Sequence, residues 1–394
     1  MQVVAGRPLP GKAGTRRPYR IAGLLLVITL AGCTHREAGK DWQAAVKTVK
    51  SRFAPDSRLE VFRVDVRVDD GRMITKGEVE SAAAKAALLS LLRETAAGPI
   101  TDEIKVLPDP ALGSRNSGLV NISVGNVRRG PDHRAELVSQ VLLGETVELL
   151  KKNGGWYYIH CPDRYLGWID EGALLTVDAA ALTEWNSADL YRVVCQYGLL
   201  RSGPKAGAPP VCDVTAGDLL RRVAGKGSWL EASLPDGRSG FIESTALMND
   251  QSWRVSRKLT PTNIEAAARF FMGAPYLWGG TSPKGFDCSG FVKTVFFLNG
   301  TSLNRDADQQ ARQGEEVEAG SAFQNLRRGD LLFFGDKAAA DKPERIMHVG
   351  IYLSDRKFIH CSGRVRVNSL DPAAPDYDEW HAKDFVCARR FLTP

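Results

Sequence analysis

Residues 276–291 read YLWGGTSPKGFDCSGF, a glycine-rich turn that runs straight into an apolar, helix-compatible stretch ending at Leu298. The pattern predicts that Cys288 lies in the first turn of a helix. The positive end of the helix dipole favours a thiolate over a thiol at that place. Cys288 is therefore a candidate nucleophile with an expected pKa below that of an ordinary cysteine.

Two histidines follow Cys288 in an order that suits nucleophilic catalysis. His348 lies in residues 347–353, which read as a buried strand, and His360 ends the next apolar run, residues 357–360. A cysteine hydrolase needs a nucleophile, a base and a group that orients the base. We expect His348 to form an ion pair with Cys288 and to protonate the leaving amine. We expect His360 to hold His348 in the required tautomer.

The same residues have simpler explanations. A cysteine in Asp-Cys-Ser or a histidine on a strand is often only a core residue. Cys288, His348 and His360 together are also a conceivable zinc site, but a single cysteine without a Cys-x-x-Cys pair disfavours it. No metal and no other cofactor are therefore predicted. Cys361 is expected to face the opposite side of its strand from His360 and is a poor nucleophile candidate.

Composition limits the number of domains and the kind of partner. A chain of 394 residues with 43% apolar residues suits roughly two to four domains with buried cores. The net charge is +6, from 52 basic and 46 acidic residues, and the basic residues are scattered. Because nucleic-acid binding needs clustered positive charge, no nucleic-acid partner is predicted.

Residues 1–33 read as a secretory leader. Arg16, Arg17 and Arg20 precede an apolar run, residues 21–30, that is too short to span a bilayer. The Leu-Ala-Gly-Cys sequence ending at Cys33 resembles a bacterial lipobox, which implies cleavage before Cys33 and lipidation of its thiol. We therefore expect a periplasmic lipoprotein of the cell envelope, anchored to the membrane by lipid. An ordinary signal peptide cut nearby is the alternative.

Export would place the remaining cysteines in an oxidising compartment. Apart from Cys33 and Cys288 there are five (7 − 2 = 5), so at least one stays unpaired. Cys195 and Cys212 are the nearest neighbours in sequence and could bridge two strands of one small barrel. Buried free thiols are the alternative.

Residues 40–110 are predicted to form a small αββαβ domain. The expected helices and strands, in chain order, are residues 40–53, 59–68, 73–79, 81–95 and 102–107. The pattern resembles BON-like modules of cell-envelope proteins. Residues 108–117 read as a linker.

An internal repeat occupies residues 118–248. Six residues recur 73 positions later (217 − 144 = 73): Gly144, Trp156, Gly167, Trp168, Ile169 and Leu174 as Gly217, Trp229, Gly240, Phe241, Ile242 and Leu247. Short alternating strands separated by turns fit a small barrel in each copy. The pattern resembles bacterial SH3-like domains, predicted at residues 118–178 and 188–248.

Residues 259–394 form the last predicted unit. Residues 262–272 read as a helix, the Cys288 helix follows, and several strands come after it. Helices gathered before a β-rich half indicate an α+β domain. The whole chain is thus predicted to be a multidomain α+β protein with an αββαβ domain, two SH3-like β-barrels and a C-terminal catalytic domain.

Residues 262–394 resemble the NlpC/p60 cell-wall cysteine peptidases. The matching motifs are Tyr276-x-Trp-Gly-Gly, Phe-Asp-Cys288-Ser-Gly, His348-Val-Gly and the trailing His360. The resemblance implies a papain-like domain that is permuted in chain order. It also implies hydrolysis of an amide bond in peptidoglycan stem peptides.

The same motifs contain the expected contacts to the substrate. Tyr276 and Trp278 belong to the first motif, and Asp287 and Ser289 flank the nucleophile, so all four are expected to bind the substrate. The backbone N–H of Cys288, with a donor from the Tyr276 side chain, is expected to stabilise the oxyanion. Loss of one such donor typically costs about 3 kcal/mol.

Residues 304–310 resemble the Arg-Asp-x-x-Gln-Gln segment of γ-D-glutamyl-L-diamino-acid endopeptidases, which also carry two SH3-like domains. The resemblance implies that Asp306 binds the free amine of an N-terminal L-Ala, and that Glu136 and Tyr165 of the first SH3-like domain close the cleft. Carboxylates at a cleft end favour an ammonium group, and a wall there excludes longer substrates. Solvated charges at Glu136 and Asp306 and simple packing of Tyr165 are the alternatives. Ala307 stands where the subgroup often has serine.

The leading hypothesis is a monomeric, lipid-anchored cysteine peptidase that acts on small peptidoglycan-derived peptides. It would cut between γ-D-Glu and the diamino acid, which is lysine or diaminopimelate. Hydrolysis of intact, crosslinked peptidoglycan, with the barrels as wall-binding modules, is an alternative within enzymes. A non-catalytic envelope scaffold that binds the cell wall is the alternative outside them.

Overall fold

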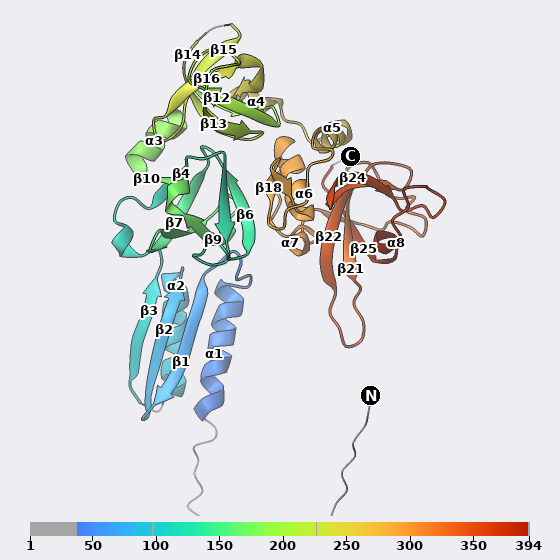
Figure 1. The fold of residues 1–394 in the computed structure, drawn as a ribbon. Helices are drawn as coiled ribbons and strands as arrows, with labels where there is room; N and C mark the ends of the chain where they lie inside the picture. Colours follow the sequence, from blue (N-terminus) through green and yellow to red (C-terminus); the bar gives the residue numbers. More distant parts are fainter. Residues whose placement is uncertain (1–37, 97, 226, 393–394) are drawn as a thin grey trace, which may run out of the picture.

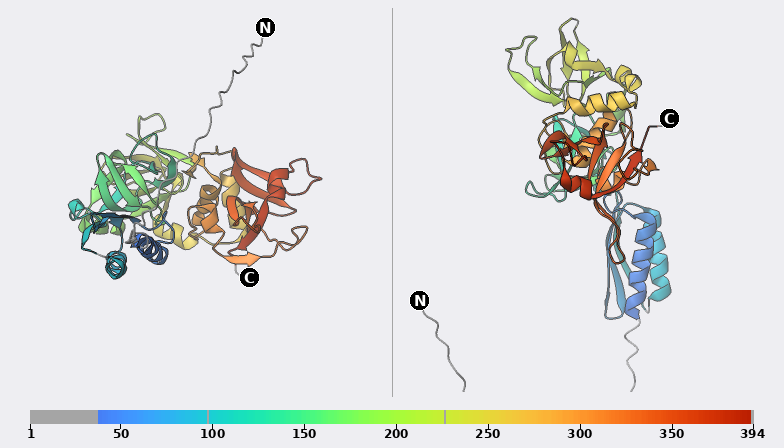
Figure 2. Two further views of the ribbon diagram at one scale, coloured as in Figure 1. Left: turned by 90° about the horizontal axis from the view of Figure 1, so that it is seen from below. Right: turned by 90° about the vertical axis from the view of Figure 1, so that its right-hand side faces the viewer.

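The computed structural model describes residues 38–392, except residues 97 and 226, as four units that follow one another along the chain (Figure 1). The first three units are stacked, and the last lies beside the stack. The first unit projects away from the others, as the right-hand view of Figure 2 shows. The predicted leader, with Cys33, lies outside the described residues. Within the described part of the chain, no helix is long and apolar enough to cross a membrane.

The first unit contains the elements of an αββαβ fold in the predicted order. They are α1 (Ala38–Phe53), β1 (Phe62–Asp69), β2 (Arg72–Val79), α2 (Ala82–Thr95) and β3 (Ile100–Val106). β2 pairs antiparallel with β1 and parallel with β3. Ser81 starts α2 because its side chain accepts a hydrogen bond from the Ala84 N–H. Both helices pack on the sheet, with Val49, Val66 and Leu88 buried between them.

The second and third units are seven-stranded sheets with a common topology. The first copy contains β4 (Ser117–Val120), β5 (Val124–Arg128), β6 (Leu137–Leu142), β7 (Thr146–Asn153), β8 (Trp156–His160), β9 (Leu166–Asp170) and β10 (Leu174–Val177). The second contains β11 (Leu190–Val193), β12 (Tyr197–Arg201), β13 (Pro210–Thr215), β14 (Leu219–Ala224), β15 (Trp229–Ser233), β16 (Ser239–Glu243) and β17 (Leu247–Asn249). The strand orders, β10-β4-β7-β8-β9-β5-β6 and β17-β11-β14-β15-β16-β12-β13, match strand for strand. The sequence repeat is therefore a repeat of the fold.

Short helical segments connect these strands and units. The 3-10 turns are η1 (Pro110–Leu112), η2 (Glu171–Ala173) and η3 (Ser244–Ala246), and the helices are α3 (Ala179–Ser187) and α4 (Asp250–Ser256). η2 and η3 each precede the last strand of their copy. α3 joins the two copies, and α4 leads towards the last unit.

The six cysteines among the described residues are all free thiols. Cys195 and Cys212 are therefore not bridged, and the Cys212 thiol donates instead to the Asp213 carbonyl oxygen at 2.9 Å. Cys361 is buried in the core of the last unit and donates to the Phe286 carbonyl oxygen at 3.2 Å. This contact makes Cys361 a packing residue.

The last unit is a six-stranded antiparallel sheet with helices against it. Its strands, in sheet order, are β20 (Glu315–Val317), β25 (Phe385–Arg390), β21 (Leu331–Asp336), β22 (Arg345–Tyr352), β23 (Lys357–Ser362) and β24 (Arg364–Ser369). Its helices are α5 (Pro261–Phe270), α6 (Cys288–Leu298), α7 (Ala307–Gln310) and α8 (Glu379–Lys383), and the small hairpin β18 (Thr281–Ser282) and β19 (Gly285–Phe286) precedes α6. α6 packs over β22 and β23 and buries Phe291, Val292 and Val295. The architecture is multidomain α+β, as predicted.

The first barrel and the last unit meet at β6. The Gln140 side-chain oxygen accepts hydrogen bonds from the Thr281 N–H at 3.0 Å and the Ser282 hydroxyl at 2.9 Å. Gly279 has φ +78°, and a Cβ there would lie 2.3 Å from the Leu137 carbonyl oxygen, so the close approach requires glycine. These contacts hold the first barrel against the turn that leads into α6.

Candidate active site

Cys288 is the first residue of α6, as the sequence predicts. Asp287 caps this helix with extended backbone angles (φ −88°, ψ −178°), and its side chain accepts a hydrogen bond from the Gly290 N–H at 2.7 Å. A Cβ on Gly290 would lie 2.0 Å from the Gly280 carbonyl oxygen, so the helix start fits closely under the preceding turn. Cys288 is 8% exposed. Its sulfur thus lies at the positive end of α6 with little access to water.

The Asp287 carboxylate is held from several sides. It accepts from the Gly279 N–H at 3.0 Å, and the buried Arg305 guanidinium reaches its two oxygens at 3.1 and 2.5 Å. The Ser289 hydroxyl donates to Asp287 at 3.2 Å and accepts from Arg305 at 3.1 Å. These side chains use their hydrogen bonds to hold the turn around the nucleophile. Direct contacts of Asp287 and Ser289 with a substrate stay a prediction.

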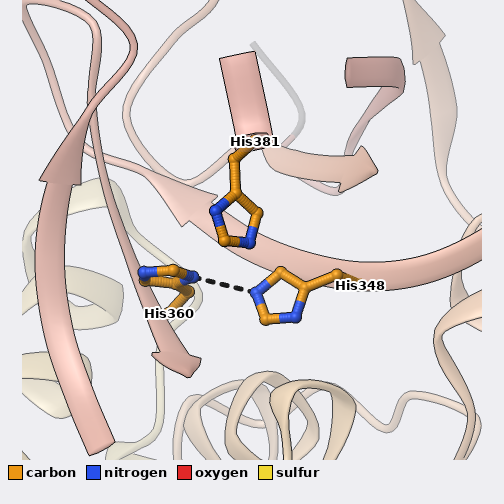
Figure 3. A group of neighbouring side chains, drawn as sticks. All are labelled: His348, His360 and His381. Carbon is orange, nitrogen blue, oxygen red and sulfur yellow. Dashed lines mark hydrogen bonds between the residues drawn. The ribbon is translucent and has the colours of Figure 1, made fainter. Parts of the chain in front are cut away.

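His348, His360 and Asn368 form a hydrogen-bonded chain across β22, β23 and β24. His348 Nε2 lies 2.9 Å from His360 Nδ1 (Figure 3), and His360 Nε2 lies 3.0 Å from Asn368 Oδ1. The Asn368 amide is oriented because its nitrogen donates to the Asp376 carbonyl oxygen at 3.2 Å. Since Asn368 Oδ1 only accepts, His360 Nε2 carries a proton, and His360 Nδ1 accepts from His348 Nε2–H. His348 Nδ1 is then the unprotonated nitrogen that can act as a base.

A third imidazole, His381 on α8, lies against the other two (Figure 3). Its ring centroid is 4.5 Å from that of His348 and 4.7 Å from that of His360, and its Nδ1 is 2.7 Å from an Asp378 carboxylate oxygen. One ring nitrogen from each histidine lies within 4.8 Å of the others. A metal ion at this place would have to replace the hydrogen bond between His348 and His360.

Burial favours the uncharged form of all three imidazoles. It lowers the pKa of His348 well below the usual value and the pKa of His360 to about 3, and the pKa of His381 is also lowered. Repulsion between neighbouring charged rings acts in the same direction for His348 and His360. His348 therefore stays available as a neutral base in mildly acidic solution.

Burial also keeps the Cys288 thiol protonated in this conformation. Burial and the Asp287 carboxylate raise the pKa of Cys288 to about 12, against the stabilising backbone N–H groups of Val349 and Ser289. The predicted lowering of this pKa is therefore wrong for the substrate-free pocket, because the loss of water outweighs the helix dipole. Val349 directly follows His348, so the sulfur lies beside the strand that carries the base. The thiol and the imidazole are therefore both uncharged here, whereas an ion pair was predicted.

A cavity of about 470 Å³ lies next to Cys288 and is lined by three of the four units. Its walls include Cys288 and every residue predicted to bind substrate: Glu136, Tyr165, Tyr276, Trp278, Asp287, Ser289 and Asp306. Residues 345–347, which lead to His348 on β22, also line it. The structure thus brings together residues from distant parts of the chain that the motifs single out.

Asp306 and Glu136 are two of the four carboxylates that line this cavity. Asp306 caps α7, and its Oδ2 accepts from the Tyr165 hydroxyl at 2.9 Å. Glu136 accepts from Trp278 Nε1 at 2.8 Å and forms an ion pair with Arg129. Burial raises the pKa of Asp306, whereas the hydrogen bond from Arg129 lowers the pKa of Glu136. The first barrel therefore contributes a polar wall, although the roles of these residues in substrate binding stay predictions.

Sequence reasoning missed several residues of the site. Arg58 of the first unit lines the cavity, and its Nη1 donates to Asp306 Oδ2 at 2.8 Å. Arg305 is buried beside the nucleophile, and Asn368 and His381 surround the two predicted histidines. Single polar residues of these types are common in the chain and follow no period. The one available signal was the position of Arg305 within the matched 304–310 segment.

Comparisons with known proteins identify the catalytic unit and the first barrel. The model of the NlpC/P60 family matches residues 273–384, and that of the bacterial dipeptidyl-peptidase Sh3 domain matches residues 127–174. The chain is 27% identical over 270 residues to dipeptidyl-peptidase 6 of Lysinibacillus sphaericus. The match covers 66% of this chain and 94% of that protein. It is 30% identical over 235 residues to the gamma-D-glutamyl-L-lysine dipeptidyl-peptidase of Bacillus subtilis, with 56% of this chain and 71% of that protein covered.

A solved structure shares the fold. An NlpC/P60 family protein from Bacillus cereus superimposes with a TM-score of 0.58 at 23% identity, over 70% of this chain and 100% of that chain. The fold, the family models and the match to most of the Bacillus subtilis protein point the same way. The chain belongs to the NlpC/P60 family of cysteine peptidases.

Proposed function

We propose that this protein is a cysteine endopeptidase that hydrolyses the bond between γ-D-glutamate and the diamino acid in peptidoglycan stem peptides with a free N-terminal L-Ala. The observation that carries the proposal is the cavity that joins Cys288 to Asp306, Tyr165 and Glu136. A nucleophile and several carboxylates that line one cavity suit a short peptide whose ammonium group is bound while an amide bond faces the sulfur. Two relatives named gamma-D-glutamyl-L-lysine dipeptidyl-peptidase support this substrate class.

The hydrogen-bonded histidines account for the proton transfers. His348 Nδ1 takes the Cys288 proton as Sγ attacks the carbonyl carbon. His360 Nδ1 holds the resulting imidazolium by accepting from His348 Nε2–H. The tetrahedral intermediate then collapses, the C–N bond breaks, and His348 gives the proton to the leaving amine. Water deprotonated by the same nitrogen hydrolyses the thioester, and the proton returns to the sulfur.

The neutral resting pair fits this mechanism. The thiolate forms only when the proton moves to His348, and the backbone N–H groups of Val349 and Ser289 stabilise its charge. In a buried site these hydrogen bonds act with little screening by water. Burial therefore raises the pKa of the free thiol and also strengthens the hydrogen bonds that stabilise charge during the reaction.

The acidic end of the cavity favours small fragments over intact cell wall. We expect Asp306 and Glu136 to attract a free ammonium group, and we expect the first barrel, which lines the cavity beside them, to exclude a longer chain. A stem peptide still attached to the glycan strand has no free amine at that position. We therefore expect the protein to act on peptides already released from the glycan.

The test is cleavage of L-Ala-γ-D-Glu-L-Lys and its diaminopimelate counterpart, with the products identified by mass spectrometry. The wild type should release L-Ala-γ-D-Glu, and Cys288→Ala should lower kcat by about 10⁴-fold or more, because the nucleophile is lost. Cys387→Ala, which removes a free thiol on β25, is the matched control and should keep wild-type turnover. Equal turnover by wild type and Cys288→Ala would contradict the proposal.

Two further substrates separate this activity from its alternatives. Acetylation of the substrate amine should block cleavage, and unimpaired cleavage would refute the role of the acidic end. Release of peptides from purified, crosslinked peptidoglycan would instead favour a wall hydrolase whose barrels bind the cell wall.

We also propose that the protein is anchored in the cell envelope by lipid on Cys33, from the leader pattern in residues 16–33. This place would bring the enzyme close to peptides released from peptidoglycan. Metabolic labelling with a fatty-acid analogue should label the wild type and leave Cys33→Ala unlabelled. An unlabelled wild type would refute the anchor and leave the catalytic proposal intact.

A further inference from the structure

Arg58 brings the first unit into the substrate cavity. It lies in the loop between α1 and β1 and lines the acidic end next to Asp306. Its Nη1 donates to Asp306 Oδ2 at 2.8 Å, the same oxygen that accepts from the Tyr165 hydroxyl at 2.9 Å. The carboxylate is thus held by one side chain from the first unit and one from the first barrel.

The Arg58 guanidinium uses all five of its N–H groups in this cluster. Nε and Nη2 donate to Asp56 at 2.9 and 2.8 Å, and Nη1 and Nη2 donate to Asp308 at 2.7 and 2.8 Å. Asp56 is held in turn by Gln309 Nε2 at 2.7 Å. Four of the five bonds do not involve Asp306, so the guanidinium keeps its place when Asp306 takes up a ligand. It has no donor left for the substrate itself.

The loop that carries Arg58 is fixed to the first barrel. The Arg58 carbonyl oxygen accepts from the Leu166 N–H at 2.8 Å, directly after Tyr165. Around this contact the two units share an apolar cluster, made of Val61, Leu107, Leu150, Tyr158, Leu166 and Trp168. The burial of this cluster makes Arg58 a permanent part of the cavity wall rather than a movable lid.

The cluster still attracts a cation. The guanidinium groups of Arg58 and Arg312 face three carboxylates, which leaves a net charge of −1 (2 − 3 = −1). Arg58 pairs with Asp56, Asp306 and Asp308, and Arg312 lies 3.5 Å from Asp308. A carboxylate accepts hydrogen bonds at about four positions, and Arg58 and Tyr165 use two of them on Asp306 Oδ2. Burial raises the pKa of Asp306. The charges of Arg305 and Arg58 and the hydrogen bond from Tyr165 oppose that change, and the Asp308 carboxylate adds to it. Arg58 thus favours the ionised carboxylate that an ammonium group requires.

We propose that Arg58 is a positioning residue that holds the Asp306 carboxylate in the orientation that binds the terminal ammonium group of the substrate. The inference rests on the proposed function, because it concerns the same amine-binding end of the cavity. The substrate site is then assembled from three units, and the first unit is part of it rather than a separate module. The family models match residues 127–174 and 273–384, and neither range includes Arg58.

Steady-state kinetics of Arg58→Gln on L-Ala-γ-D-Glu-L-Lys test the inference. The variant should raise KM about tenfold with kcat within about twofold of wild type, because one charge-assisted hydrogen bond to Asp306 is lost. The rise in KM should grow as the pH falls from 7 to 5, because Asp306 without Arg58 takes up a proton more readily. Arg58→Lys keeps the charge without the planar fork and should give an intermediate KM.

Arg63→Gln is the matched control. Arg63 on β1 donates to the Tyr158 hydroxyl at 2.7 Å, also between the first unit and the first barrel, but it does not line the cavity. The KM of Arg63→Gln should therefore equal that of wild type. Because Arg58 acts through Asp306, adding Arg58→Gln to Asp306→Asn should raise KM no further. A KM unchanged or lowered in Arg58→Gln, or additive effects in the double variant, would overturn the inference.

Failure of the proposed function gives a different result. In that case the wild type cuts none of the peptides, and calorimetry can still measure the binding of L-Ala-γ-D-Glu to Cys288→Ala with and without Arg58→Gln. Binding that weakens about tenfold in the double variant supports the role of Arg58. Equal affinity, or binding to neither protein, overturns it.

Discussion

The two SH3-like copies share a core but present different faces. Ile169 and Ile242, 73 residues apart (242 − 169 = 73), occupy the same strand position and are both buried. Gly167 and Gly240 also correspond. A Cβ on Gly167 would lie 2.4 Å from an atom of the neighbouring strand, and a Cβ on Gly240 would lie 2.6 Å from one. The same close packing between strands is therefore needed in both barrels, which explains why these positions repeat.

The copies differ where the first one meets the catalytic unit. Glu136 and Tyr165 of the first copy correspond to Pro209 and Arg238 of the second (209 − 136 = 73; 238 − 165 = 73). Of the described residues that line the cavity, four come from the first copy and none comes from the second. The four are Arg129, Glu136, Val138 and Tyr165. Since the second copy folds without a glutamate or a tyrosine at these positions, the barrel fold does not require them. The divergence between the copies supports a functional explanation over a packing one.

The largest difference in kcat/KM between variants of the two copies is expected when a carboxylate charge is removed. Glu136→Gln should lower kcat/KM on L-Ala-γ-D-Glu-L-Lys about 10- to 100-fold, because hydrogen bonds to charged groups are worth about 1.5–3 kcal/mol. Glu243→Gln on β16 of the second copy removes an exposed charge and serves as the control, with expected wild-type kinetics. Comparable losses in both variants would mean that the first copy has no special role.

A smaller difference in KM between the two copies is expected when the shared glycines are replaced by alanine. Gly167→Ala and Gly240→Ala should each lower the free energy of unfolding of their barrel by roughly 1–3 kcal/mol, because the added methyl group meets the neighbouring strand. Only Gly167→Ala should also raise KM, by a few-fold, since Gly167 on β9 comes soon after Tyr165 in the chain. Calorimetric melting and steady-state kinetics measure the two effects. A KM raised equally by both substitutions would contradict the division of roles.

The smallest effect is expected in the pH dependence of KM. The pKa of Asp306 is raised by burial, so KM should rise a few-fold in mildly acidic solution, at a higher pH than the usual aspartate value of about 3.9 would give. The pKa values of His348 and His360 are lowered, so kcat should stay nearly constant in the same range. Steady-state kinetics between pH 4.5 and about 7.5 separate the two parameters. A kcat that falls below about pH 6.5 would show that the base titrates like an ordinary histidine.

Local patterns predicted most of the fold and the nucleophile. The turn and the cap that place Cys288 at the start of α6 lie within residues 276–291, and the repeat is visible by comparison of the chain with itself. The motifs also named every predicted substrate residue that lines the cavity. The ionisation of Cys288 was predicted wrongly because it depends on burial in the core of the last unit, which no local pattern reveals.

The sequence by itself determined the helix that begins at Cys288, the two barrels and the order of cysteine and histidines, because these depend on neighbouring residues and on periodicity. Only the tertiary structure decided which charged and polar side chains meet. Arg58 and Asp306 are 248 residues apart, and His381 reaches His348 from a separate helix. Such partners follow no local pattern, since they are brought together only when distant elements, within one unit or from two units, pack against one another and exclude water between them.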